Sequence, residues 1–394
     1  MSRIATFLIP LLCSGTALAQ SSTIQTAAAP ALSSPVAYVY VSTYDPTNSV
    51  VALAASPDGS LTYVGAAPSP QPITALSVTK KFLFGTGNNL NIFSYSIAPS
   101  GAPQYLATTD AGIYLSDPSS YFYSEILQVD ETGSDLYAFA ADSKDNLYLL
   151  SFKIEDDGEL KFLGSTYWTG NLLQIQFVQN NEYAVSTGCV ITDPRPYQPV
   201  IYPETLVYKR ESSGLLSYIG ESDIDPVAES QHEYCAEGGA SDSRDHLAVF
   251  FENIDPAKNS LVEYALGAYS VSPQGKVTTK SDYKNMPSLG APLVGITPNE
   301  ISISPSGEIL AVGGLEGYQF FHFNGANPIT KESGVIGLKH NWPQALAWDK
   351  SNHLYILTLD SVIPYSITPA SYKKHTPYSF SVPHPYSIIV LSLQ

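Results

Sequence analysis

The chain has 394 residues, of which 36 are acidic and 19 are Lys or Arg, so its formal net charge is −17 at pH 7. A surface of this sign repels phosphate backbones and anionic lipid headgroups, which excludes nucleic-acid binding and electrostatic docking on membranes. The length is sufficient for a large core in one or two domains.

The N-terminal residues predict a signal peptide. Arg3 precedes an apolar run at residues 4–13, and small residues lead up to Ala19 at the spacing of a cleavage site. The run is too short to span a bilayer, so we expect cleavage after Ala19 and a secreted or periplasmic protein. A lipid anchor through Cys13 is disfavoured because a bulky leucine precedes it. Residues 20–35 are small and unpatterned, which predicts a flexible leader.

From residue 36 onward, short runs of β-branched and aromatic residues alternate with turn clusters, without helical periodicity. Two kinds of hairpin recur: an inner type such as ISISPSGEILAVGG (301–314) and an outer type such as SFKIEDDGELKFL (151–163). The inner turns return roughly every 45 to 63 residues, as in repeat architectures. Their centres lie near Lys81, Thr132, Asn180, Ser243, Ser306 and Ser351.

Two hairpins in each period predict a four-stranded antiparallel blade. Three strands of one blade come from the start of the chain, beginning with AYVYVST (37–43), and PYSIIVLS (385–392) supplies the fourth. The sequence therefore predicts an all-β fold over 36–394, a seven-bladed β-propeller of four-stranded antiparallel blades. Pairing of the C-terminal strand with the N-terminal blade would close the ring. A pair of β-sandwiches is the alternative, because many short strands fit either architecture.

The two hairpin types resemble those of the β-propeller lactonase family, which includes bacterial phosphogluconolactonases and fungal carboxymuconate cyclases. SPDGSLTYVG (56–65) is similar to the family's inner hairpin, and KIEDDGELKFL (153–163) to its outer one. The similarity extends from about residue 37 to about residue 393. It implies a seven-bladed propeller that handles a small lactone or organic acid, although related propellers with other functions look similar.

The family's catalytic pattern has an Arg and a His entering one inner strand and a Glu leaving its partner. Glu252 falls on that Glu, while Phe251 stands where an Asn is usual. Counting back without gaps, Ala236 and Glu237 occupy the positions of the Arg and the His. A further His of the family has no counterpart in GNLLQIQF (170–177). The resemblance thus implies a catalytic role for Glu252, within a set that is otherwise rebuilt from other loops or lost.

Two long connections contain the cysteines that remain after cleavage. Cys189 begins the insertion 189–204, and Cys235 lies in the connection 223–239. An even pair in an oxidising compartment predicts one disulfide. Both connections should rise on the same face of the propeller, so the bridge would hold them together over the channel mouth.

Beneath that bridge we expect a polar cluster. Glu252, His232 and Arg195 are the catalytic candidates, and Tyr234 and Glu237 are ligand-binding candidates. Glu252 or His232 would activate water as a general base, and Arg195 would steady a developing oxyanion. The alternative is a solvated ion-pair network that only holds the loops in place.

Other loops on the same face offer aromatic and imidazole groups that suit a sugar or an aromatic acid. These ligand-binding candidates are Trp168, Asn171, His340, Trp342 and His384. The tryptophans serve equally well as packing wedges. No Cys-x-x-Cys or His-x-x-x-His spacing occurs, so we expect neither a metal nor a cofactor. The weaker candidates for binding a cation through oxygen are Asp142, Glu316 and Asp360.

The sequence therefore predicts a monomeric, exported propeller that acts on or binds a small sugar-derived or aromatic acid or lactone. The alternative is a non-catalytic extracytoplasmic recognition propeller that binds a glycan or a protein partner, which the missing Arg–His pair favours. A redox quinoprotein propeller would need motifs that the sequence lacks.

Overall fold

A computed structural model describes residues 34–394 with short internal gaps. The positions outside the description are 1–33, 88, 118, 145, 169–170, 173–174, 193–199, 223–231, 243, 256, 259, 290–300, 316, 339–341, 381–383 and 394, together with the side chains of 123–126, 168, 171–172, 190–192 and 200–204. The predicted signal peptide (1–19) and residues 20–33 of the predicted leader therefore lie outside it. Among the described residues, no helix is long and apolar enough to cross a bilayer.

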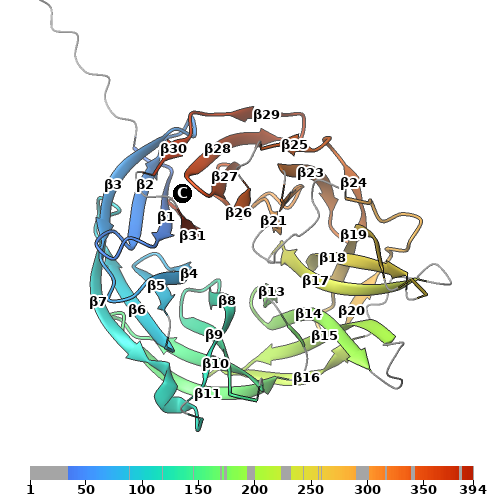
Figure 1. Cartoon of the computed structure of the whole chain (residues 1–394), viewed down its shortest axis with the longest axis horizontal. Coiled ribbons are helices and arrows are strands. Elements are labelled where there is room, and N and C mark those ends of the chain that lie inside the picture. Colours follow the sequence, from blue (N-terminus) through green and yellow to red (C-terminus); the bar gives the residue numbers. More distant parts are fainter. Residues whose placement is uncertain are drawn as a thin grey trace, which may run out of the picture. The chain divides into compact units, whose positions relative to one another are not determined.

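The described strands form seven antiparallel sheets, which are the blades of a propeller (Figure 1). Blade 1 contains β31 (Pro385–Ser392), β1 (Ala37–Thr43), β2 (Val50–Ala55) and β3 (Leu61–Ala67); blade 2 contains β4 (Ile73–Val78), β5 (Phe82–Gly87), β6 (Asn91–Ile97) and β7 (Pro103–Asp110); blade 3 contains β8 (Tyr121–Val129), β9 (Asp135–Ala141), β10 (Leu147–Ile154) and β11 (Leu160–Trp168). Blade 4 contains β12 (Asn171–Leu172), β13 (Gln176–Val178), β14 (Tyr183–Thr192), β15 (Val200–Arg210) and β16 (Leu216–Ser222); blade 5 contains β17 (Glu233–Ser241), β18 (His246–Asp255), β19 (Ser260–Val271) and β20 (Val277–Thr279). Blade 6 contains β21 (Ile301–Ile303), β22 (Ile309–Gly314), β23 (Gly317–Asn324), β24 (Asn327–Lys331) and β25 (Ile336–Gly337); blade 7 contains β26 (Pro343–Trp348), β27 (His353–Thr358), β28 (Ser361–Thr368), β29 (Ser371–Lys374) and β30 (Tyr378–Ser379).

The predicted seven-bladed propeller and its closure are confirmed. The last strand, β31, pairs antiparallel with β1, with Ala37 opposite Ser392 and Tyr40 opposite Ile389. Blades 4, 6 and 7 each have a fifth short strand, because one inner or outer strand is broken into two pieces that pair with the same neighbour. The four-strand layout of each blade is therefore kept. A 3₁₀ turn at Ala111–Tyr114 lies between blades 2 and 3.

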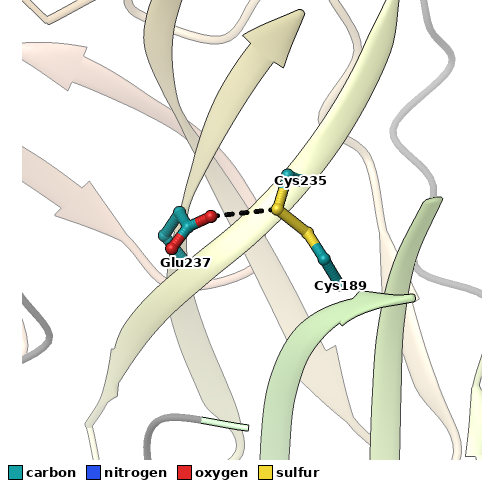
Figure 2. Close-up of side chains that lie close together, drawn as sticks. All are labelled: Cys189, Cys235 and Glu237. Carbon is teal, nitrogen blue, oxygen red and sulfur yellow. Dashed lines mark hydrogen bonds between the residues drawn. A yellow bond between two sulfur atoms is a disulfide. The ribbon is translucent and has the colours of Figure 1, made fainter. Parts of the chain in front are cut away.

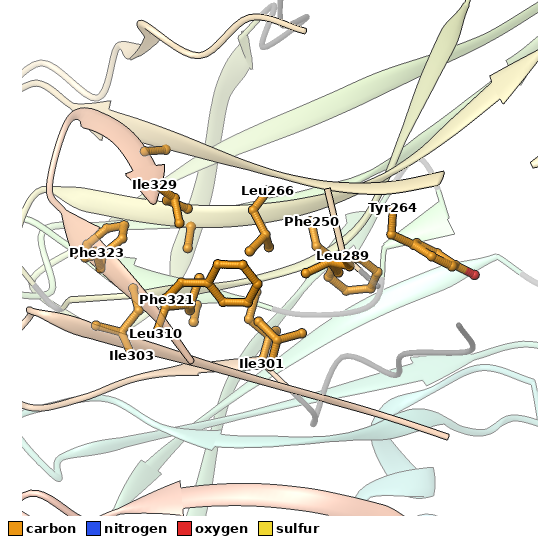
Figure 3. Packing of buried hydrophobic residues seen from close by; sticks show 14 residues of the cluster. Phe250, Tyr264, Leu266, Leu289, Ile301, Ile303, Leu310, Phe321, Phe323 and Ile329 are labelled. Atoms are coloured by element: carbon orange, nitrogen blue, oxygen red, sulfur yellow. The ribbon is translucent and has the colours of Figure 1, made fainter. Parts of the chain in front are cut away.

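The core of the described region consists of clusters of buried side chains, one between each pair of neighbouring blades. Side chains that alternate along a strand serve both sides: Phe250 packs towards blade 6 and Phe251 towards blade 4. Figure 3 shows the cluster between blades 5 and 6, where Phe250 and Leu266 meet Phe321. Burying each such ring stabilises the fold by roughly 1.5–3 kcal/mol, so apolar packing holds each blade on both faces.

The turns of the outer hairpins dock on the preceding blade, which explains the glycine in that repeat. Gly101 and Gly214 have φ of +88° and +93°, in the left-handed region that favours glycine. A Cβ on Gly214 would lie 2.6 Å from Asp135, and one on Gly101 would lie 2.3 Å from the ring of Tyr38. The close approach lets Tyr137 of blade 3 donate its hydroxyl to the Gly214 carbonyl at 2.6 Å.

Serine hydroxyls link neighbouring inner strands around the axis. The amide of Leu76 in β4 donates to Ser387 Oγ of β31 at 3.2 Å, and the amide of Val129 in β8 donates to Ser77 Oγ of β4 at 2.8 Å. An innermost strand pairs with another strand of its blade on one side only. The serine hydroxyls therefore accept hydrogen bonds from backbone amides that have no partner within their own sheet.

A buried ion pair joins blades 3 and 4. Arg210 of β15 lies with Nη2 3.3 Å from a carboxyl oxygen of Asp130 and in direct contact with Asp135, and both carboxyl side chains are completely buried. Lys153 also approaches Asp135, at 3.2 Å. These ion pairs connect the turn between β8 and β9 of blade 3 to strand β15 of blade 4.

Candidate functional site

The polar groups predicted to form a site gather at one end of blade 5. Glu237 lies on the inner strand β17 and Glu252 on β18, near the connections 223–231 and 256–259. In an antiparallel sheet these two connections emerge at the same end, opposite to the turn between β17 and β18. The structure thus brings two of the predicted acidic residues to adjacent strands of one blade.

The predicted disulfide is present (Figure 2). Cys189 of β14 and Cys235 of β17 are bonded, with a Cα–Cα distance of 5.2 Å and a sequence separation of 46. The bond joins blades 4 and 5 beside the candidate site.

Glu237 occupies an irregular position in β17. The register with β18 shifts between Ala236 and Gly238, so Glu237 is the extra residue of a bulge. Its Oε1 lies 3.0 Å from Cys235 Sγ (Figure 2). Because a disulfide sulfur has no hydrogen, a hydrogen bond here requires the protonated carboxyl as donor. Burial, and then the negative charge of Glu252, raise the pKa of Glu237 to about 7.

Glu252 is held from the other side by a residue that the sequence analysis did not identify. Tyr264 of β19 lies opposite Glu252 and donates its hydroxyl to Oε1 at 3.0 Å. The ring of Tyr264 is buried in the cluster between blades 5 and 6 (Figure 3). Glu252 is therefore positioned by a side chain that the core itself fixes.

The other candidates beneath the disulfide have different surroundings. His232 is half-buried and immediately precedes β17. Tyr234 is only 4% exposed and packs between blades 4 and 5, its ring centroid 6.2 Å from that of Phe251. Tyr234 thus occupies a packing position. Arg195 lies outside the described residues.

The candidates from more distant loops belong to other blades. Trp342 precedes β26 of blade 7 and is 46% exposed, and His384 precedes β31 of blade 1 with a φ of +81°. The backbones of Trp168 and Asn171 belong to β11 and β12, but their side chains are outside the description, as is all of His340. Trp342 and His384 are two and three blades away from Glu237.

Two groups of described residues have the spacing of metal ligands, and both have another explanation. In the group of Cys189, Cys235 and Glu237, the disulfide occupies both sulfurs. In the group of Asp242, Asp245 and His246, the Asp242–His246 contact of 2.8 Å closes a turn.

The same closure recurs in blade 7, where Asp349 contacts His353 Nδ1 at 2.8 Å and accepts the His353 amide. Asp142, predicted as a cation ligand, closes its turn in a similar way by accepting the amide and the side chain of Asn146. These carboxylates therefore have a structural role, which is to close turns that recur from blade to blade. Glu316 lies outside the described residues.

A cavity of about 1020 Å³ lies at the opposite end of the inner strands. The ends of β4, β8 and β31 line it, and Lys80, Lys81 and Lys350 lie among the turns at its rim, with Glu155 and Asp156 on the blade 3 side. None of its lining residues comes from blade 5. The channel cavity and the Glu237–Glu252 pair are therefore separate features.

No family model and no curated protein matches the chain. Solved structures do match. A protein named as a "putative 6-phosphogluconolactonase" from Bacteroides uniformis has a TM-score of 0.62 at 13% identity, over 90% of this chain and 99% of that one. A functionally unknown protein from Desulfotomaculum acetoxidans gives 0.55 at 11%, over 84% and 92%. Hydrazine synthase from Kuenenia stuttgartiensis gives 0.53 at 12%, over 91% and 99%.

Identities of this size establish a shared fold alone. The resemblance to propeller lactonases that the hairpins predicted is confirmed at the level of the fold. Because the matched proteins have unrelated names, the function has to be argued from the side chains of blade 5.

Proposed function

We propose that the protein is an exported, lactonase-like propeller that hydrolyses a small sugar-derived or aromatic lactone at the carboxyl groups of blade 5. The observation that carries the proposal is the pair Glu237 and Glu252 on adjacent strands, of which Glu237 keeps its proton up to about pH 7. Two carboxyl groups in different protonation states supply an acid and a base in one site. The fold shared with a protein named as a lactonase supports the same reaction class.

In the proposed reaction, Glu252 takes a proton from water as the water oxygen attacks the carbonyl carbon of the lactone. The ring C–O bond then breaks, and Glu237 gives its proton to the departing oxygen, so the product is an open hydroxy acid. Solvent returns the proton from Glu252 to Glu237. Tyr264 positions Glu252 through its hydroxyl. His232 as an alternative base and Arg195 as an oxyanion partner remain parts of the proposal.

The competing proposal is a recognition propeller that binds a glycan or a protein without turnover. It is favoured by Ala236 and Glu237 standing at the positions where the resembling family has its Arg and His. Hydrolysis distinguishes the two proposals.

The test is a lactone-hydrolysis screen of protein purified from residue 20 onward, read as acid release above the spontaneous rate. We expect turnover of at least one lactone, a loss of about 10²–10⁴-fold in Glu252→Gln, and a smaller loss in Tyr264→Phe. Glu211→Gln, in the exposed turn between β15 and β16, is the matched control. Equal rates in Glu252→Gln and the unmodified protein would refute the assignment, and no turnover of any lactone would favour the recognition propeller.

The chain organisation belongs to the same proposal: a signal peptide at 1–19, a leader at 20–35 and the propeller at 36–394, in a monomer released outside the cytoplasm. The Cys189–Cys235 disulfide supports an oxidising location. N-terminal sequencing of protein recovered from a periplasmic or culture fraction tests cleavage after Ala19.

A further inference from the structure

The cavity of about 1020 Å³ at the other end of the channel has the dimensions of a ligand-binding site. Its walls are the ends of β4, β8, β21, β26 and β31, which are among the innermost strands in Figure 1. Its rim contains the turns that follow β4, β8 and β26. The volume lies at the upper end of the range for pockets that hold small organic molecules.

Aliphatic side chains make up the apolar part of the wall. Leu76, Leu127 and Leu346 line the cavity, and each is more than nine-tenths buried in a core cluster between two blades. Val78 and Val390 also line it and are half-buried, so part of their apolar surface is accessible. Because core packing fixes the leucines, this wall is formed before a ligand arrives, which lowers the entropic cost of binding.

Hydrogen-bond donors lie among these aliphatic groups. Ser77 Oγ and Ser387 Oγ line the cavity and accept backbone amides of neighbouring inner strands at 2.8 Å and 3.2 Å. Each hydroxyl keeps its own hydrogen, which it can donate to a ligand. Gln128 and Ser302 line the cavity as well, and the described residues give their side chains no hydrogen-bond partner. The wall can therefore bind an acceptor group.

The rim carries positive charge on one side. Lys80 and Lys81 follow β4 of blade 2, and Lys350 follows β26 of blade 7. Strand β31 of blade 1 contacts both β4 and β26, so the lysines flank its end. Within the described part of the chain, none of these three exposed lysines forms an ion pair. The acidic lining residues all belong to blade 3 and are Asp130, Glu131, Glu155 and Asp156.

Each part of the cavity matches one part of a ligand. The aliphatic wall favours an apolar body, since burying it removes apolar surface from water. The serine hydroxyls and the lysine ammonium groups are donors, and lysine has no acceptor. A carboxylate is the acceptor that gains most from such donors, because hydrogen bonds between charged groups are stronger than neutral ones.

We propose that this cavity binds a small monocarboxylate with an aliphatic or aromatic body. The carboxylate lies on the side of Lys80, Lys81 and Lys350, and the body packs against the aliphatic wall. This second site is separate from the carboxyl pair of blade 5, because none of its lining residues comes from that blade. The proposal therefore does not depend on the proposed hydrolysis.

The experiment compares benzoate with benzyl alcohol, two probes that share a ring and differ in charge. Titration calorimetry of the purified protein should give a Kd for benzoate that is lower by about tenfold or more, because the carboxylate adds charge-assisted hydrogen bonds. Added salt should weaken the binding of benzoate and leave that of the alcohol unchanged. Equal affinities for the two probes, or binding of neither, would overturn the proposal.

A triple lysine variant tests the rim. Lys80→Gln, Lys81→Gln and Lys350→Gln together should raise the Kd of benzoate by about tenfold and leave that of benzyl alcohol unchanged. The matched control removes the same charge at three exposed positions outside the cavity, with the changes Lys161→Gln, Lys276→Gln and Lys331→Gln. Equal losses in the two triple variants would show that net charge, and not the rim, attracts the probe, and would refute the site.

Two single variants locate the binding. Ser302→Phe fills the cavity and should abolish the binding of both probes, whereas Glu252→Gln at blade 5 should bind benzoate as the unmodified protein does. Unchanged binding in Ser302→Phe, or loss of binding in Glu252→Gln, would refute the assignment to this cavity. Thermal unfolding shows first whether Ser302→Phe is folded. If it is not, the lysine variants decide, since all six lysines are exposed.

Discussion

Cys235 and Glu252 lie directly opposite each other on β17 and β18, so the disulfide and the candidate base share one rung of the blade 5 sheet. Cys235 is bonded to Cys189 of blade 4. On the next strand, Tyr264 donates to Glu252 and packs its ring against blade 6. The position of Glu252 is therefore fixed from both neighbouring blades.

Replacing Cys189 and Cys235 together by serine should destabilise the protein by about 4 kcal/mol, by the chain-entropy estimate for a loop of 46 residues. Thermal unfolding of the double variant beside the unmodified protein measures the loss. Mass spectrometry of an unreduced digest should show the two cysteine peptides linked. Free thiols in protein recovered from an oxidising compartment would contradict the bridge.

Glu237→Gln should stabilise the protein at pH 8 and have little effect at pH 4. The pKa of Glu237 is raised from 4.5 to about 7 on folding, so between these values the folded state binds more protons than the unfolded state. Stability is then lost as pH rises from 4.5 to 7, by up to about 3 kcal/mol. Chemical denaturation of both proteins at several pH values tests this, and an identical pH dependence would rule it out.

The hairpin repeat was predictable because each turn needs a particular residue for a local reason, as Gly101 and Gly214 do by their positive φ. The disulfide was predictable because the predicted cleavage after Ala19 would leave only two cysteines, Cys189 and Cys235. The contact of Tyr264 with Glu252 was not, since it depends on a strand register that shifts between Asn253 and Ile254.

Glu237 was identified as a ligand-binding candidate, but its raised pKa was not predicted. A bulge breaks the alternation of side chains along β17, so the sequence alone does not tell which way this carboxyl points. Its ionisation follows from burial and from the charge on a neighbouring strand.

Deleting residues 385–394 should open the ring. The deletion removes β31, which leaves β1 without a partner on one side and exposes apolar residues of two clusters, such as Val39 and Tyr40. Exposed sheet edges pair with other chains, so we expect aggregation in size-exclusion chromatography. Deleting only residue 394, beyond β31, is the control. A monomeric truncated protein with an unchanged melting temperature would refute closure by this strand.

Arg210→Ala should destabilise the protein by about 3–5 kcal/mol, because it leaves the buried carboxylates of Asp130 and Asp135 without their main counter-charge. Lys153 compensates little, since its side chain is 40% exposed and reaches only Asp135. Lys209→Ala, at the adjacent exposed position of β15, is the matched control and should cost less than about 1 kcal/mol. Denaturant unfolding measures both variants. A deficit no larger than that of Lys209→Ala would refute the role of the Arg210 charge in holding blades 3 and 4 together.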